Sequence, residues 1–223
     1  RYPSLAGTSV QRDFVEFPSQ LHEHWLATPE VLGRFARHYQ TGAPIPAELV
    51  AKIQRARHFN QGFATVEYLA SAIYDLEIHT APVPPIERSE TGGGDPDGSA
   101  GGAAGRAPRG IDPIAFERRV MAEIGCPTEI VMRHRPTQFG HIFASDGYSA
   151  GYYAYLWADT LVADAAEAFR EAGSFYDPAI ARRLLESVMR VGNSIPPHQA
   201  FRAFRGRDVD TDALMRDRGF PVG

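Results

Sequence analysis

The sequence predicts an all-α fold, built from a series of helices. Apolar residues recur at three- and four-residue spacing over most of the chain, and strand signals are scarce. Residues typical of helix ends mark several boundaries, such as Asp112 before Pro113, and Gly125 and Gly173 after periodic segments. We therefore expect about eight or nine helices in one structural domain.

The composition is that of an ordinary globular protein. Of 223 residues, 43% are hydrophobic and 22% charged, which suits one large domain or two small ones. The net charge of -4 argues against nucleic acid as a partner, because such binding normally needs a basic face. No apolar run approaches the roughly 20 residues that span a bilayer. The single cysteine, Cys126, excludes an intramolecular disulfide and favours a reducing, cytoplasmic location.

Residues 1–81 are expected to be helical over most of their length. The expected helices span residues 12–25, 29–40, 47–57 and 62–79. The first would be kinked or distorted by Pro18, which lacks an amide hydrogen, and the second opens at Thr28 and Pro29. In the fourth, one amphipathic pattern comprises Phe63, Val66, Leu69, Ala70, Ile73, Leu76 and Glu77.

The composition changes abruptly over residues 82–110, which are dense in Gly, Pro and Asp and have no periodicity. Such a segment buries too little apolar surface to offset its ordering entropy, so we expect a flexible surface insertion. An inserted linker without function is the simplest interpretation. Helices should resume in residues 111–223, over residues 112–125, 149–172, 177–190, 196–204 and 210–219.

One candidate metal ligand lies in the stretch "RDFVEFPSQLHEHW", residues 12–25. Glu16 is flanked by Val15 and Phe17, so we expect it to be partly buried, and a buried carboxylate needs a cation or metal partner. The alternative is an ordinary acid in the first turn of a helix, where the helix dipole favours it. His22 and His24 stand two residues apart and point to different sides of a helix, so we expect them to serve packing or solvation.

A second constellation lies in "FGHIFASDGYSAGYYAYLW", residues 139–157. His141 is surrounded by the glycines Gly140, Gly147 and Gly151. The tyrosines Tyr148, Tyr152 and Tyr155 follow at i, i+4 and i+7, which would bring three phenols to one helix face. Phenol and imidazole N–H groups are suitable donors to an oxyanion in acyl transfer, whereas the alternative is an aromatic core stripe with its hydroxyls in water.

No complete catalytic set is present in the chain. The sequence has no H-E-x-x-H, no G-x-S-x-G and no P-loop. Four segments nevertheless closely resemble the C-terminal part of the thimet oligopeptidase family of zinc metallopeptidases, nearest to its peptidyl-dipeptidase Dcp branch. They are "SLAGTSVQRDFVEFPSQLHEHW", "ARHYQTGAPIPAEL", "FNQGFATVEYLASAIYDLE" and "FGHIFASDGYSAGYYAYLWADTLVADAAEAF".

The resemblance implies a zinc-dependent hydrolase that acts on short peptides. In that family an H-E-x-x-H helix supplies two histidine ligands and a glutamate base, and the third ligand corresponds here to Glu16. The H-E-x-x-H would lie upstream of Arg1, so we expect this chain to be a portion of a longer enzyme and inactive alone. Its expected partner is then the N-terminal part of the same enzyme.

The resemblance also implies roles for the second constellation. His141, Tyr152 and Tyr155 would stabilise the oxyanion, and Tyr148, Gly147 and Gly151 would bind substrate. Arg135 would hold the free C-terminal carboxylate of a peptide, because a guanidinium fork suits that group, although a solvated loop arginine is the alternative. A different class of function, a non-catalytic helical interaction module or one chain of a split enzyme, stays open.

Overall fold

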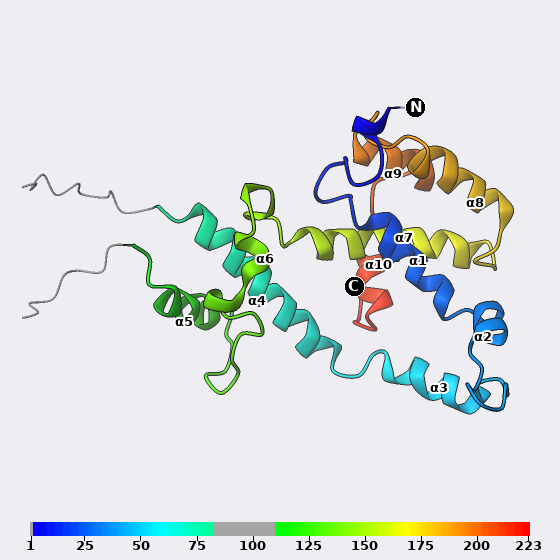
Figure 1. Cartoon of the computed structure of the whole chain (residues 1–223), viewed down its shortest axis with the longest axis horizontal. Coiled ribbons are helices and arrows are strands. Elements are labelled where there is room, and N and C mark those ends of the chain that lie inside the picture. Colours follow the sequence, from blue (N-terminus) through cyan, green and yellow to red (C-terminus); the bar gives the residue numbers. More distant parts are fainter. Residues whose placement is uncertain (1, 83–109) are drawn as a thin grey trace, which may run out of the picture. The chain divides into compact units, whose positions relative to one another are not determined.

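The computed structural model describes residues 2–82 and 110–223, and within them the chain is helical with no strand (Figure 1). An isolated antiparallel bridge joins Arg37 and Pro44. The all-α prediction is therefore confirmed, whereas the insertion predicted over residues 82–110 lies almost wholly outside the described residues. The α-helices are α1 (Phe17–Leu26), α2 (Pro29–Phe35), α3 (Ala47–Ala56), α4 (Gln61–Thr80), α5 (Pro113–Glu123), α6 (Gly140–Phe143), α7 (Ala154–Glu171), α8 (Pro178–Leu184), α9 (Pro197–Arg205) and α10 (Asp212–Asp217).

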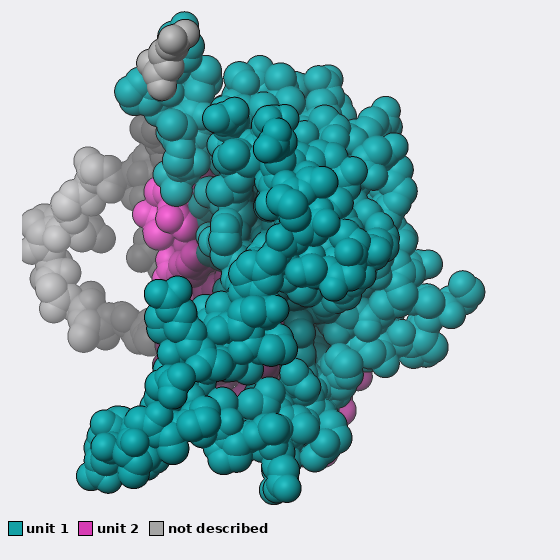
Figure 2. Space-filling view, turned by 90° about the vertical axis from the view of Figure 1, so that its right-hand side faces the viewer, with its two compact units in different colours: residues 1–66, 153–223 teal, residues 67–152 magenta. Residues whose placement is uncertain are grey.

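The described residues form two compact units, coloured separately in Figure 2. Unit 1 consists of residues 1–66 and 153–223, and unit 2 of residues 67–152. One boundary falls inside α4 and the other directly before α7, rather than at the Gly-rich segment that the composition singles out. The predicted zinc-ligand motif thus belongs to unit 1, and His141 belongs to unit 2.

The core of unit 1 forms where α1 packs on α7. Phe17 and Leu21 of α1 are fully buried, and the facing side of α7 is rich in alanine. Small side chains let two helix backbones approach closely, so the aromatic rings fill the space between them. The ring of Phe17 lies 5.9 Å from that of Phe201 in α9, which closes the core from another side.

Unit 2 has a smaller core of its own between α4, α5 and α6. Its buried apolar residues are Ala70, Tyr74, Val120, Met132, Phe139 and Ile142. The buried side of α4 differs from the expected one, because Phe63, Val66 and Leu76 are exposed whereas Tyr74 and Asp75 are fully buried. A charged side chain in the core of a helical unit requires a partner, which is described below.

Several helix boundaries follow the sequence signals. Asp112 caps α5, and its carboxylate accepts hydrogen bonds from the amides of Ile114 at 2.9 Å and Ala115 at 3.1 Å. Gly125 and Gly173, which follow α5 and α7, adopt the left-handed conformation with φ of 71° and 81°. The predicted start of α5 and the predicted ends of α5 and α7 are therefore confirmed.

Other boundaries differ from the expectation. α1 begins at Phe17 rather than residue 12, so Pro18 lies in the first turn, where no amide hydrogen is needed for an intrahelical bond. α2 ends at Phe35 rather than residue 40, because the backbone turns back on itself there, with the amide of Ile45 donating to the carbonyl of Ala36 at 2.9 Å. α7 begins at Ala154, five residues after the predicted start.

The last part of the chain keeps its predicted helical character with one change. α8 ends at Leu184 and continues as a π-helix over Leu185–Met189. Elsewhere in the described residues, three short 3₁₀-helices occur: η1 (Pro3–Leu5), η2 (Pro136–Gln138) and η3 (Asp146–Tyr148). None of the described helices combines the length and apolar character that a membrane span needs.

Candidate functional site

Glu16, the predicted metal ligand, lies at the boundary where α1 begins. Phe14 and Phe17 on either side of it are buried, with their ring centroids 5.3 Å apart, and these anchors fix the entry of the chain into the helix. Glu16 itself is half-buried, as predicted. Ser19 donates a hydrogen bond of 2.9 Å to its Oε2 atom, so the carboxylate is held in a defined position.

The two histidines of α1 make separate contacts. His22 is exposed, and its Nδ1 atom contacts the carbonyl of Pro18 one turn earlier. The ring of His24 stacks on that of Phe175 at 5.9 Å with 11° between the planes. Burial lowers the pKa of His24, although the nearby Asp217 carboxylate acts in the opposite direction. Their placement agrees with the expectation of packing and solvation.

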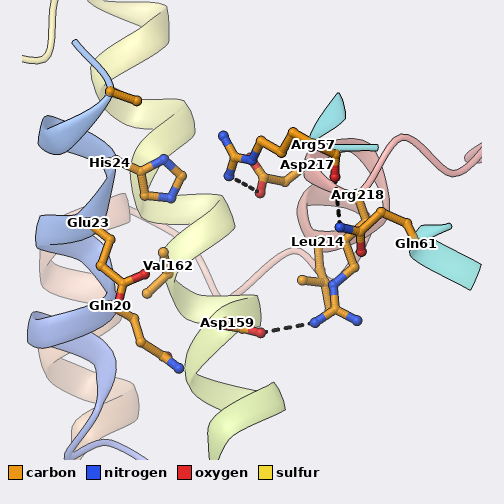
Figure 3. Close-up of a pocket in the computed structure, with 11 residues that line it drawn as sticks. Gln20, Glu23, His24, Arg57, Gln61, Asp159, Val162, Leu214, Asp217 and Arg218 are labelled. Atoms are coloured by element: carbon orange, nitrogen blue, oxygen red, sulfur yellow. Dashed lines mark hydrogen bonds and ion pairs between the residues drawn. The ribbon is translucent and has the colours of Figure 1, made fainter. Parts of the chain in front are cut away.

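A pocket of about 420 Å³ opens beside α1 within unit 1 (Figure 3). Gln20 and Glu23 line it and follow Glu16 at i+4 and i+7, so the three side chains lie along one stripe of the helix. The Oε1 atom of Gln20 is buried without a hydrogen-bond partner among the described residues. This pocket was not foreseen from the sequence.

The opposite wall of the pocket carries ion pairs (Figure 3). Arg218 of this wall lies 3.0 Å from the Asp159 carboxylate of α7, and Arg57 lies 3.1 Å from that of Asp217. Burial raises the pKa of Asp159, an effect that Arg218 opposes and that the negative charge of Glu23 reinforces. The carboxylates of Asp159 and Asp217 are thus paired with arginines, whereas the unpartnered amide oxygen of Gln20 lies on the α1 side of the pocket.

Unit 2 brings His141, Tyr148 and Tyr152 together. The ring centroid of His141 lies 5.0 Å from that of Tyr148 and 5.4 Å from that of Tyr152, with both pairs edge to face. All three side chains are half-buried. A histidine and two phenols at one place can present several hydrogen-bond donors to an oxyanion or a peptide carbonyl.

The expectation of three phenols on one helix face is wrong. Tyr148 ends η3, Tyr152 lies in the following turn, and only Tyr155 belongs to α7 and to unit 1. Ala150 interrupts the helix with a left-handed φ of 54°, a conformation expected of glycine. Among the glycines of the loop, Gly147 is exposed and a methyl group added there would meet no atom closer than 3.7 Å, whereas Gly151 is buried.

A buried carboxylate that sequence reasoning missed holds this turn. Asp75 of α4 is fully buried and accepts hydrogen bonds from the amides of Ala150 at 3.0 Å and Tyr152 at 2.8 Å. His79, one turn further along α4, lies 2.8 Å from the same carboxylate. The signal available in the sequence was an Asp and a His four residues apart in the same helix.

Arg135 lies against a buried acid of the same unit. Its Nε atom donates a hydrogen bond of 3.1 Å to Glu117, whose side chain is 6% exposed. Burial and the charge of Glu117 raise the pKa of Tyr74 to about 12. Arg135 therefore supplies the counter-charge of an interior carboxylate, a role that the sequence did not indicate.

Replacing Arg135 with alanine is expected to lower the free energy of unfolding of unit 2 by roughly 3 kcal/mol, because Glu117 would stay buried without its cation. Amide hydrogen exchange in α5 measures this loss. Arg133→Ala is the matched control, since its guanidinium is 63% exposed and lies 3.3 Å from Glu67, and should cost less than about 1 kcal/mol. Equal effects of both changes would contradict the counter-charge role.

The described residues do not complete a metal site. Within residues 2–82 and 110–223, no three His, Cys, Asp or Glu side chains come together in a group that could hold a metal ion. Glu16 offers a carboxylate of the kind that catalytic zinc accepts beside two histidines. Among the described residues, Glu16 is therefore a single candidate carboxylate and not a member of a metal-binding group.

Comparison with known proteins places these residues in a family context. The model of peptidase family M3 matches residues 1–90 and 106–220. Dipeptidyl carboxypeptidase of Escherichia coli (strain K12) is 35% identical over 222 residues, which cover 100% of this chain and 29% of that protein. Oligopeptidase A of the same organism is 32% identical over 212 residues, covering 95% of this chain and 28% of the relative.

A plant relative gives the same result. The organellar oligopeptidase A, chloroplastic/mitochondrial, of Arabidopsis thaliana is 33% identical over 214 residues, which cover 95% of this chain and 24% of the relative. The chain therefore spans less than a third of the length of these curated relatives. The family model nevertheless covers both the segment of Glu16 and the segment from His141 to Tyr155, and the chain belongs to peptidase family M3.

Proposed function

We propose that this chain is the C-terminal catalytic portion of a zinc-dependent peptidase that hydrolyses short peptides, of the peptidyl-dipeptidase or oligopeptidase type. The observation that carries the proposal is the family match across both candidate motifs, one with Glu16 and one with His141. Relatives named dipeptidyl carboxypeptidase and oligopeptidase A support the substrate class. Because we propose an enzyme of this type, we also propose the cytoplasm as the location of the chain.

In this proposal Glu16 is the third zinc ligand. Zinc bound by two histidines and one glutamate leaves a position for water and lowers the pKa of that water. Ser19, 2.9 Å from the Glu16 carboxylate, would orient the ligand, as groups around a metal site commonly do. The two histidine ligands and the glutamate base would come from the N-terminal part of the same enzyme, which is the proposed partner.

The aromatic cluster would act on the substrate. His141 and Tyr152, whose rings lie 5.4 Å apart, would donate hydrogen bonds to the oxyanion together with Tyr155. Tyr148 would bind the peptide backbone beside Gly147 and Gly151. Arg135 would hold the C-terminal carboxylate through its remaining guanidinium nitrogens while its Nε atom stays on Glu117.

The test compares the 223-residue chain with the same chain joined to the upstream part of its gene product. We expect the isolated chain to bind zinc weakly and to leave peptides intact, because one ligand of three cannot hold the metal. The joined protein should contain one zinc and cleave internally quenched peptides. Metal analysis and peptide hydrolysis check both statements, and clear activity of the isolated chain with stoichiometric zinc would contradict the proposal.

A non-catalytic helical interaction module is the second candidate. It is favoured by exposed aromatic side chains of unit 1, since Phe35 at the end of α2 and Tyr39 and Phe59 in loops are exposed by 68%, 88% and 77%. Apolar side chains of this size gain stability when a partner covers them. If the joined protein neither binds zinc nor cleaves peptides but still folds, this second function gains support.

A further inference from the structure

One stripe of α4 holds the turn at residues 148–152 within unit 2. Tyr68, Asp75 and His79 stand at i, i+7 and i+11, which places them on the same side of the helix. The helix and the turn are far apart in sequence, so this contact is a property of the folded unit. None of the three residues was a candidate on the basis of sequence.

Asp75 is the centre of the contact. Its Oδ1 atom accepts from the amide of Ala150 at 3.0 Å, and its Oδ2 atom accepts from that of Tyr152 at 2.8 Å. The Nδ1 atom of His79 lies 2.8 Å from Oδ1 and 2.9 Å from the Asp75 carbonyl oxygen. These two acceptors lie closer to Nδ1 than the Ala150 amide, which is 3.4 Å away, so we assign the proton to Nδ1, which then donates to Asp75.

The backbone of the turn is shaped to fit this carboxylate. Ala150 has a φ of 54°, a left-handed conformation that is strained for an alanine. A left-handed residue lets amides on both sides of Gly151 converge on one anion, as in the anion-binding concavities formed by successive amides. The strain persists because a fully buried carboxylate has few other donors within reach.

Tyr68 and His79 make further contacts, with the side chains of Tyr152 and Phe143. The ring of Tyr68 stacks on that of Tyr152 at 5.3 Å with 20° between the planes, and its hydroxyl donates to the Tyr152 carbonyl. The ring of His79 lies 5.3 Å from that of Phe143, the last residue of α6. His141 belongs to the same short helix as Phe143, so the stripe contacts both Tyr152 and the helix of His141.

We propose that Asp75 is the positioning residue for the turn that places Tyr152 beside His141. The carboxylate fixes the amide of Tyr152 while Tyr68 fixes its carbonyl oxygen and ring. The effect on peptide cleavage rests on the proposed function, whereas the effect on the turn does not. Loss of the Asp75 charge should release the turn without removing any group that touches substrate.

The first experiment uses the 223-residue chain as it is. In Asp75→Asn we expect hydrogen exchange at the amides of Ala150 and Tyr152 to accelerate by about 100-fold, because the asparagine amide group can accept at only one atom. Amides of α5 should change by less than about 3-fold, which shows that unit 2 stays folded. Glu77→Gln is the control, since Glu77 lies on the same helix and pairs with the half-exposed Arg119.

A second variant keeps the test decisive if Asp75→Asn unfolds unit 2. His79→Gln leaves the carboxylate in place and removes one of its three donors, so exchange at Ala150 and Tyr152 should accelerate by about 10-fold. Unchanged exchange at both amides, in whichever variant stays folded, overturns the proposal. Faster exchange confined to the turn supports it.

The second experiment uses the joined, zinc-loaded protein. Asp75→Asn should lower kcat by about 100-fold at unchanged zinc content, because a misplaced Tyr152 no longer reaches the transition state. A purely structural role would lower zinc content and folded fraction together. Faster exchange at the turn with unchanged kcat would contradict the proposed role of Tyr152 but support that of Asp75. Unchanged exchange at the turn would contradict the inference about Asp75 alone.

Discussion

Replacing Asp164 with alanine is expected to lower the free energy of unfolding of unit 1 by about 3–5 kcal/mol. Asp164 of α7 is fully buried and accepts hydrogen bonds from Arg205 at 2.7 Å, from Arg207 at 2.6 Å and from the amide of Asp210 at 2.8 Å. The side chain of Arg205 is 6% exposed and would lose its buried counter-charge, keeping only the 60% exposed Glu171 as an acidic partner. Such a loss is a large part of the stability of a domain.

Urea denaturation followed by tryptophan fluorescence measures this change. Both tryptophans of the chain, Trp25 and Trp157, belong to unit 1, so the signal reports that unit. Asp208→Ala is the matched control, because Asp208 also binds an arginine, Arg202, but its side chain is 67% exposed. The control should cost less than about 1 kcal/mol, and equal losses for the two variants would argue against the buried cluster.

Replacing Glu16 with glutamine is expected to remove zinc and peptidase activity from the joined protein. The change keeps the size of the side chain and its contact with Ser19 but replaces an anionic ligand with a neutral amide. We expect a loss of zinc affinity greater than the roughly 10- to 100-fold seen when only groups around the ligands are changed. Activity should fall with the metal content.

Competition with a zinc chelator measures the affinity, and peptide hydrolysis at saturating zinc measures what remains. Glu30→Gln is the control, because Glu30 is an exposed acid in the first turn of α2. The tryptophan fluorescence of both variants should match that of the parent chain. A Glu16→Gln protein with normal zinc content would show that the metal ligand lies elsewhere.

The sequence predicted helix ends that depend on local chemistry. Asp112 and Gly125 act through their own backbone neighbours, so the limits of α5 could be read from the residues. The start of α7 could not, because Ala150 adopts a left-handed φ of 54° and the turn it makes is bound by Asp75, about 75 residues earlier. Helical periodicity continues through a turn of this kind, and only the tertiary contact breaks it.

In the candidate site, too, local features could be predicted from the sequence and tertiary contacts could not. The half-buried position of Glu16 followed from its neighbours Phe14 and Phe17, which are buried as a pair. The spacing of the three tyrosines gave a wrong arrangement, because it assumed a continuous helix from Tyr148 to Tyr155. The contact of Asp75 with the turn was not predicted, although Asp75 and His79 stand four residues apart, since a polar residue in a helix is usually solvated.

Unit 1 is assembled from two stretches of chain that are separated by all of unit 2. During synthesis on a ribosome, Phe17 and Leu21 emerge well before the α7 surface that covers them. Unit 2 is continuous and can collapse first, which shortens the loop that must close. Until α7 is synthesised, the apolar side of α1 is exposed and can bind chaperones. The order of the segments along the chain therefore determines how long the nascent chain is prone to aggregation.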